Sequence, residues 1–201
     1  STAWDTIFDD VAPHEKGIFY GTAGNDSISG LQIDETIRAL GGNDVVRAGR
    51  GKDTVEGGGG HDRLNGGAAA DTLRGGNGDD ILEGRRGGDV LAGGRGNDRL
   101  DGHRGADTLN GGAGDDMMQG GEGADLFVFT AVAAGAVDRI EDFEIGVDLL
   151  RLSGAAHFED LTLNDRTEDG ESYTEVAWQG FRIHLDGVAS SDLTAASFEF
   201  G

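Results

Sequence analysis

The sequence predicts an all-β fold, a right-handed parallel β-roll of twelve nonapeptide repeats with a β-rich C-terminal cap. Three observations support this prediction. From Gly21 to Val128 the chain divides into nine-residue blocks without an insertion, the sixth residue of each block is acidic, and the eighth is apolar. A flexible glycine-rich linker has no reason to hold two residue classes in phase over such a length. We therefore expect residues 21–128 to form one ordered, repetitive domain.

Residues 1–20 precede the repeats and are rich in large apolar side chains. These are Trp4, Ile7, Phe8, Ile18, Phe19 and Tyr20. Because the terminal turns of a repeat fold need a cover, we expect an N-terminal cap here. The first ten residues are acidic and lack the apolar core of a signal peptide, and no stretch approaches the ~20 apolar residues of a membrane span.

Each block is predicted to be a loop followed by a short strand. Positions one to six are rich in Gly, which adopts left-handed backbone conformations without steric cost, and positions seven to nine are extended. Side chains alternate along a strand, so an inward eighth position places the seventh and ninth outside. Two blocks then form one flattened turn of the roll, and twelve blocks form six turns about 4.8 Å apart.

The sixth-position residues are the candidate metal ligands. The loops of odd and even blocks form two stacks, here called the odd stack and the even stack, and the gaps between successive loops are lined by carbonyls and carboxylates. Such hard oxygen donors favour Ca²⁺ over zinc. The acidic residues are Asp26, Glu35, Asp44, Asp53, Asp62, Asp71, Asp80, Asp89, Asp98, Asp107, Asp116 and Asp125.

The pattern G-G-x-G-x-D-x-U-x resembles the calcium-binding nonapeptide repeat of RTX proteins. The resemblance implies that two successive loops of one stack hold each ion through the repeat Asp residues and main-chain oxygens. Five gaps on each side allow at most ten Ca²⁺ ions. We expect the main-chain donors to include Gly58, Gly60, Gly75, Gly76, Asn77, Gly78, Gly93, Gly94, Arg95, Gly96, Gly112 and Gly114.

Departures from the pattern predict unequal sites. Ile33 and Ala69 replace the fourth-position Gly of two even blocks, and Glu35 replaces Asp in the first of these. We expect the even-stack sites near the N-terminus to be weak or empty. The regular odd-stack loops from Gly57 through Asp116 should be the strongest.

Composition indicates that a cation controls folding. The 201 residues include 38 Gly and no Cys, carry a net charge of −22, and are only 36% hydrophobic. Such a chain resists compaction and normally reads as disordered. We expect the repeats to be largely disordered without Ca²⁺ and to fold outside the cell, so the predicted location is secreted and extracellular.

Residues 129–201 are predicted to be a β-rich cap that also carries an export signal. The segment around Asp138 and Asp142 resembles the one that follows the roll in serralysin-type RTX proteins, which implies that these two residues are possible ligands. Alternation in Tyr173–Trp178 and Phe181–Leu185 predicts a β-hairpin. Asp192–Phe200 resembles the C-terminal tail of type I secretion substrates, so type I secretion machinery is an expected partner.

No catalytic motif is recognisable. His14-Glu15 is followed at the third position by Ile18, so the zincin helix motif fails. The remaining histidines, His61, His103, His157 and His184, are scattered and expected to be surface residues. We expect a non-catalytic monomer that binds no nucleic acid.

An alternative function is a binding module for anionic polysaccharide or a cell surface. Arg50, Arg86 and Arg104 share the third position of even blocks. Adjacent turns would bring Arg86 and Arg104 to within roughly 5 Å of each other. The repeat modules of alginate epimerases resemble such a surface, but relief of acidic repulsion also explains these arginines.

Overall fold

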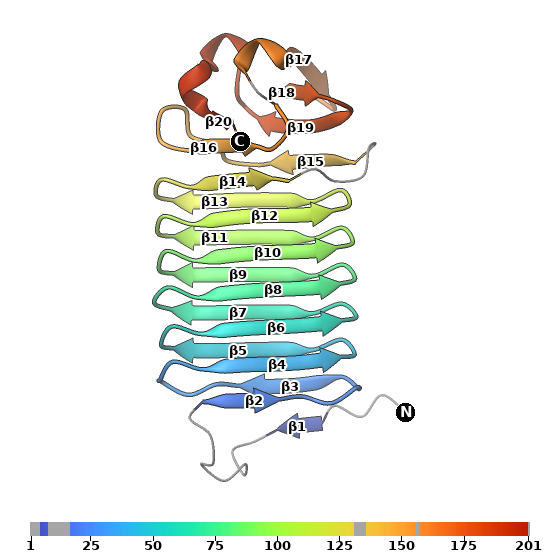
Figure 1. The fold of residues 1–201 in the computed structure, drawn as a ribbon, viewed down its shortest axis with the longest axis vertical. Coiled ribbons are helices and arrows are strands. Elements are labelled where there is room, and N and C mark those ends of the chain that lie inside the picture. Colours follow the sequence, from blue (N-terminus) through green and yellow to red (C-terminus); the bar gives the residue numbers. More distant parts are fainter. Residues whose placement is uncertain (1–4, 8–16, 131–135, 156, 201) are drawn as a thin grey trace.

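The computed structural model describes residues 5–7, 17–130, 136–155 and 157–200. The chain winds into a flattened roll whose walls are two β-sheets, and successive strands alternate between them (Figure 1). The odd-numbered strands up to β15, with β17, β18 and β19, form an 11-stranded sheet, here called sheet A. The even-numbered strands up to β16, with β20, form a nine-stranded sheet, here called sheet B.

The strands of sheet A, in spatial order, are β1 (Asp5–Ile7), β3 (Asp26–Ser29), β5 (Val45–Arg50), β7 (Arg63–Ala68), β9 (Ile81–Arg86), β11 (Arg99–Arg104), β13 (Met117–Glu122), β15 (Val137–Ile140), β19 (Phe181–Asp186), β18 (Glu171–Trp178) and β17 (Thr162–Glu168). Those of sheet B are β2 (Ile18–Tyr20), β4 (Thr36–Gly41), β6 (Thr54–Gly59), β8 (Thr72–Asn77), β10 (Val90–Arg95), β12 (Thr108–Ala113), β14 (Leu126–Phe129), β16 (Leu149–Leu152) and β20 (Phe198–Phe200).

The register of the sheets confirms the parallel β-roll. Leu64 of β7 lies opposite Leu82 of β9, and Leu73 of β8 lies opposite Leu91 of β10, so each turn takes two nine-residue blocks. All pairings between successive turns of the repeat region are parallel.

The division of each block into loop and strand differs from the prediction. Strand β6 takes positions seven to nine of one block and the first three positions of the next, Gly57 to Gly59. The other complete strands of the roll span the same six block positions. Only positions four to six of each block therefore form the loop. Sequence reasoning assigned the first three positions to the loop because of their Gly content, but they belong to the parallel ladder, in which the second position has positive φ, 114° at Gly58.

The core of the roll is a column of eighth-position side chains. All twelve are at most 1% exposed: Ile28, Ile37, Val46, Val55, Leu64, Leu73, Leu82, Leu91, Leu100, Leu109, Met118 and Phe127. The first position, Gly or Ala, is also buried in most turns. A Cβ added at Gly57 or Gly75 would collide with the sixth-position carboxylate of the same block and with a carbonyl of the next turn, so these positions require Gly. The predicted inward direction of the eighth position is confirmed.

The two sheets continue past residue 128 into the C-terminal region. Strands β15 and β16 extend sheets A and B, and β19 and β20 extend them again. The predicted hairpin is confirmed, since β18 and β19 pair antiparallel. The C-terminal core is aromatic and includes Phe129 and Trp178, whose rings meet edge to face at 6.4 Å. Three short 3₁₀ turns, Phe158–Asp160, Ser190–Asp192 and Ala195–Ser197, connect these strands.

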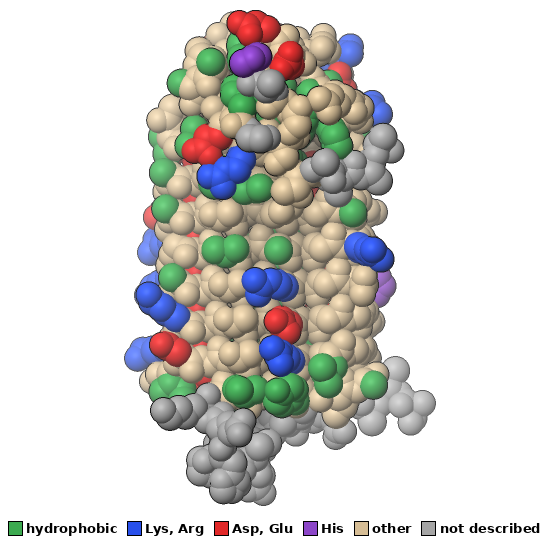
Figure 2. All heavy atoms as spheres, viewed as in Figure 1, with side chains coloured by type: hydrophobic (Ala, Val, Ile, Leu, Met, Phe, Trp, Pro, Cys, Tyr) green, Lys and Arg blue, Asp and Glu red, His purple; other side chains and the backbone are tan. Residues whose placement is uncertain are grey.

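At the N-terminal end, β1 and β2 extend the two sheets. Of the residues expected to form a cap, Trp4 and Phe8 lie outside the described residues, and Phe19 packs partly buried against the core. Ile18 and Tyr20 are 38% and 54% exposed, and the N-terminal cap stays a prediction. Figure 2 shows hydrophobic side chains gathered at this end of the roll.

None of the described segments is a helix with the length and apolar character needed to span a membrane.

Candidate metal centres

The sixth-position acids form two buried ladders, one in each stack of loops. All twelve are at most 4% exposed. In each pair of successive turns, the later Asp accepts a hydrogen bond through Oδ1 from the backbone N–H of the earlier acid, at 2.7–2.9 Å. In ten of the twelve acids, all but Asp26 and Glu35, one carboxylate oxygen thus holds two turns in register.

The second carboxylate oxygen has no partner. Ten Oδ2 atoms are buried and accept no hydrogen bond: those of Asp44, Asp53, Asp62, Asp71, Asp80, Asp89, Asp98, Asp107, Asp116 and Asp125. A buried carboxylate oxygen without a donor or a cation carries a large free-energy cost. This set of atoms therefore needs positive charge between the turns.

Burial raises the pKa of these carboxyls above their ordinary value of 3.8. Backbone hydrogen bonds lower it in part, and neighbouring carboxylates raise it further. The pKa is about 6 for Asp44, Asp62, Asp80, Asp116 and Asp125. It is about 7 for Asp71, Asp98 and Asp107, and raised also for Asp53 and Asp89. The folded roll thus disfavours the anionic form of its own ligands.

Main-chain oxygens line the same gaps. The fourth-position residues Gly60, Gly78 and Gly96 have φ between 116° and 124°, which side chains rarely tolerate. A Cβ added at Gly78 would collide with the Gly60 carbonyl oxygen of the preceding turn. The carbonyls of the fourth position therefore point along the roll axis from one loop toward the next.

The predicted main-chain donors divide into two groups. Gly60, Gly78, Gly96 and Gly114 lie in the loops, whereas Gly58, Gly75, Gly76, Gly93, Gly94 and Gly112 lie within strands β6, β8, β10 and β12. Asn77 and Arg95 end strands β8 and β10, and their carbonyls already accept the N–H groups of Gly60 and Gly78, at 2.8 and 2.7 Å. Their remaining lone pairs are the ones available to a cation.

The ends of the stacks are built differently from the middle. The carboxylate of Asp26 accepts the Thr22 N–H, and that of Glu35 accepts the Leu31 N–H through both oxygens. The first acid of each stack is thus satisfied by its own loop.

At the C-terminal end, Asp138 continues the odd ladder by accepting the Asp116 N–H at 3.0 Å, and burial raises its pKa to about 7. Asp142 instead accepts the N–H groups of Gly120 and Gly121, both at 2.9 Å. Asp148, which sequence reasoning missed, ends the even ladder by accepting the Asp125 and Glu144 N–H groups. The available signal was the pattern acid-x-apolar in Asp148-Leu149-Leu150, repeated from the blocks.

The four histidines within the described residues do not form a site, and His14 lies outside them. His61 is exposed in an odd loop, but His184 is stacked on Tyr173 with only 17% of its side chain exposed, so its assignment to the surface was wrong. His103 is only partly exposed in β11 and lies 3.3 Å from Asp101. Among the described residues no three His, Cys, Asp or Glu side chains converge on one point, so a cation in the gaps would also need main-chain oxygens.

The donor set fits a hard divalent cation. At the ladders of sixth-position acids the donors are carboxylate and carbonyl oxygens, and Ca²⁺ takes six to eight oxygen ligands in flexible geometry. The orphan oxygens and the main-chain carbonyls therefore match the kind of donor that Ca²⁺ prefers.

Comparison with known proteins identifies several similar structures. Two are solution structures of subunits of the Azotobacter vinelandii mannuronan C5-epimerase. The AlgE6R2 subunit is 30% identical to this chain, and the match covers 63% of this chain and 91% of the subunit, with a TM-score of 0.48. The AlgE6R3 subunit is 28% identical, and the match covers 67% of this chain and 80% of the subunit, with a TM-score of 0.33. The extracellular lipase LipA from Serratia marcescens is 19% identical, with a TM-score of 0.50, and matches 98% of this chain but 42% of its own. At 19% identity, the similarity to the lipase is evidence for the fold of this chain and not for its function.

No similar sequence was found among curated proteins. The model of the RTX calcium-binding nonapeptide repeat matches the chain in four copies, over residues 18–32, 30–64, 56–91 and 92–127. Because these copies are longer than one block, the number of twelve nonapeptides stays a prediction. The match covers more than half of the chain, which therefore belongs to the family of RTX calcium-binding nonapeptide repeat proteins.

Proposed function

We propose that this chain is a non-catalytic module that folds when Ca²⁺ fills the gaps between its turns. The observation that supports this most strongly is the set of ten buried carboxylate oxygens without partners. Asp138 and the ten Asp residues named above would supply carboxylate oxygens, and the fourth-position glycines would supply carbonyls. Asp26, which the sequence also predicts as a ligand, already accepts hydrogen bonds from Thr22 through its carboxylate. When bound, Ca²⁺ neutralises the carboxylates and joins neighbouring loops.

Calcium then contributes directly to the free energy of folding. The unfolded chain lacks the preformed gaps, so ion binding and folding are coupled. With a net charge of −22, the chain repels itself until cations bind. The affinities typical of extracellular calcium modules, roughly 10⁻⁴ to 10⁻³ M, would keep it unfolded at low calcium and folded outside the cell.

The first test is far-UV circular dichroism during a calcium titration from chelator to about 10 mM, which brackets extracellular-module affinities. A cooperative gain of β signal with Ca²⁺, and a weaker response to Mg²⁺, supports the proposal, because Mg²⁺ demands stricter octahedral geometry. A folded signal that is insensitive to calcium would contradict it. Calcium bound per chain, measured by equilibrium dialysis, would then count the sites.

We also propose that the chain is exported by a type I system as part of a longer extracellular protein. Residues 1–20, 21–128 and 129–201 would act as N-terminal cap, calcium-binding roll and C-terminal cap with the export signal. Low calcium inside the cell would keep the repeats unfolded for passage. Secretion of a reporter fused to residues 129–201, lost when Asp192–Phe200 is deleted, tests this assignment.

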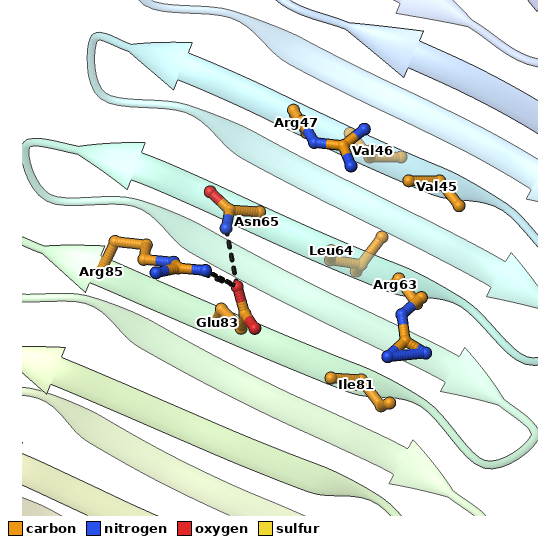
Figure 3. A pocket seen from close by; sticks show the side chains of 9 residues that line it. All are labelled: Val45, Val46, Arg47, Arg63, Leu64, Asn65, Ile81, Glu83 and Arg85. Carbon is orange, nitrogen blue, oxygen red and sulfur yellow. Dashed lines mark hydrogen bonds and ion pairs between the residues drawn. The ribbon is translucent and has the colours of Figure 1, made fainter.

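A second candidate function is binding of an anionic polysaccharide to sheet A. Arg47, Arg50, Arg63 and Arg86 are exposed on strands β5, β7 and β9, and among the described residues none of them forms an ion pair. Arg47, Arg63 and Arg85 line one shallow hollow together with Asn65 and Glu83 (Figure 3). If Ca²⁺ filled the gaps, it would neutralise the carboxylates of the repeats. These arginines would then face solvent on a surface without an excess of negative charge.

Sheet B offers a matched control for this candidate. Arg74 and Arg95 lie on strands β8 and β10 and also lack ion pairs within the described part of the chain. Calorimetric titration with alginate in calcium should show weaker binding by Arg50→Ala/Arg86→Ala and unchanged binding by Arg74→Ala/Arg95→Ala. Equal effects of the two double variants would indicate nonspecific charge attraction and remove the sheet A site.

A further inference from the structure

The two stacks of loops differ on their outer side, at the fifth position of each block. In the odd stack every fifth residue carries a side-chain acceptor: Asn25, Asn43, His61, Asp79, Asn97 and Asp115. Each accepts a hydrogen bond from the backbone N–H of the corresponding residue one turn later, at 2.7–3.0 Å. The last member, Asp115, accepts the Val137 N–H at 2.8 Å. This outer ladder runs along the whole odd stack.

The even stack lacks such a ladder over most of its length. Asp34 accepts the Lys52 N–H at 2.8 Å, and this is the one bond of the kind among the described even loops. The later fifth positions are Ala70, Gly88, Ala106 and Ala124, which have no side-chain acceptor. In these loops no side chain ties the outer edge of one turn to the next.

Backbone conformation adds a second difference. Ala69, at the fourth position of an even loop, has a φ of 91° although it is not Gly. The described odd loops contain no such residue, and Leu40, Arg85 and His103, which also have positive φ, lie within strands β4, β9 and β11. A side chain in this region costs roughly 1 kcal/mol or more, so this even loop is held in shape against local strain.

We propose that the two stacks are two classes of calcium site, and that the odd stack fills first. The outer ladder supplies each odd loop with a hydrogen bond to the next turn that most even loops lack, so it offsets part of the conformational entropy that calcium binding must overcome in the odd stack. The even loops become ordered on binding itself and need a higher calcium concentration. This inference rests on the proposed calcium sites and adds an order of loading to them.

The test is a calcium titration of the full chain followed by ¹⁵N NMR, with the backbone amides of the sixth-position residues as probes. The odd-stack amides of Asp62, Asp80 and Asp98 should reach their bound positions at a lower calcium concentration than the even-stack amides of Asp71 and Asp89. One hydrogen bond per loop predicts a separation of roughly fivefold to tenfold. Coincident midpoints, or earlier filling of the even stack, would overturn the order of loading while leaving the calcium sites themselves intact. If calcium shifted the resonances of neither set of amides, both the order of loading and the calcium sites themselves would be overturned.

Three variants show whether the ladder positions the loops. Asn97→Ala removes the acceptor for the Asp115 N–H and should raise the calcium midpoint of the odd-stack amides alone. Asn97→Asp keeps an oxygen acceptor, as Asp79 does naturally, and should restore that midpoint. Ala106→Asn installs an acceptor in the even stack and should lower the even-stack midpoint. A shift of both stacks by the same factor in any variant would indicate general stability and contradict the positioning role.

Discussion

Asp80 and Asp62 are joined by a hydrogen bond that uses only half of a carboxylate: Asp80 Oδ1 accepts the Asp62 N–H at 2.8 Å, while Asp80 Oδ2 is buried without a partner. The Asp80 N–H itself donates to Asp98 Oδ1, so the same relation passes to the next turn. One oxygen therefore maintains the fold and the other is left for a cation.

Replacing Asp80 by Asn should have opposite effects with and without calcium. Asn keeps an oxygen for the Asp62 N–H but removes the charge, so the calcium midpoint should rise about tenfold, equivalent to about 1.4 kcal/mol. In chelator the same change removes a buried charge and should stabilise residual β structure. Circular dichroism with and without calcium measures both effects.

The matched control is Asp79→Asn, which makes the same change of charge one residue away. Asp79 is exposed, and an Asn there still offers Oδ1 to the Asn97 N–H. Its calcium midpoint should remain close to that of the parent. Equal shifts in the two variants would mean that net charge, rather than the buried oxygen, controls calcium binding.

Acidification in chelator should favour the folded roll. The pKa values of Asp71, Asp98 and Asp107 rise from 3.8 to about 7 on folding, mainly by burial, so the folded form binds protons more tightly than the unfolded form. Ionising these buried carboxyls destabilises the folded roll relative to the unfolded chain. This loss of stability is absent below the pKa of the unfolded carboxyls, 3.8, and is complete once the pH has passed the pKa of the folded ones, about 7. Circular dichroism in chelator should therefore show β signal falling between about pH 5 and pH 7.

Calcium binding should show the reverse dependence on pH. Because the ion displaces protons from these carboxyls, apparent calcium affinity should increase with pH over the same interval, and protons should be released on binding. Calorimetry in two buffers of different ionisation enthalpy measures that release. Affinity that is constant from pH 5 to pH 8 would contradict the carboxylate ligands.

The sequence was sufficient to predict the roll because one period controls both its core and its ligands. Leu82 and Asp80 recur in phase with their counterparts in every turn, and such regularity leaves few alternative folds. The strand length was predicted wrongly because Gly57 to Gly59 have no intrinsic β preference. They belong to strand β6 because the neighbouring turns supply hydrogen-bond partners, which a local pattern does not reveal.

Two features of the candidate sites depend on contacts between distant residues. The role of Asp148 was missed because it follows Asp125 by 23 residues rather than 18, outside the phase of the blocks. The outer ladder was missed because Asn43, His61 and Asp79 belong to different residue types. These residues share only a side-chain acceptor that can reach the backbone N–H of the corresponding residue one turn later. This relation exists only between stacked turns, so a single block does not reveal it.

Ala69→Gly should stabilise the calcium-loaded roll. Ala69 has a φ of 91° at a fourth position, where most other turns have Gly. Removing its Cβ relieves a left-handed strain of roughly 1 kcal/mol, partly offset by the greater freedom of Gly when unfolded. Thermal unfolding in calcium should show a higher midpoint. Ala70→Gly, one residue away and without positive φ, should lower the midpoint instead; the same sign in both would contradict the strain.

Asp148→Ala should loosen the junction between the roll and the C-terminal region. Both of its oxygens are used, one by the Asp125 N–H at 2.9 Å and the other by the Glu144 N–H at 2.8 Å. Leaving two N–H groups without this acceptor should cost roughly 1–3 kcal/mol of unfolding free energy in calcium. Hydrogen exchange of the Asp125 and Leu150 amides should accelerate more than that of Leu73. The control is Glu144→Ala, which removes a nearby exposed charge but keeps the backbone N–H that donates to Asp148. It should leave hydrogen exchange unchanged. Faster exchange in both variants would show that charge density, rather than this pair of hydrogen bonds, stabilises the junction.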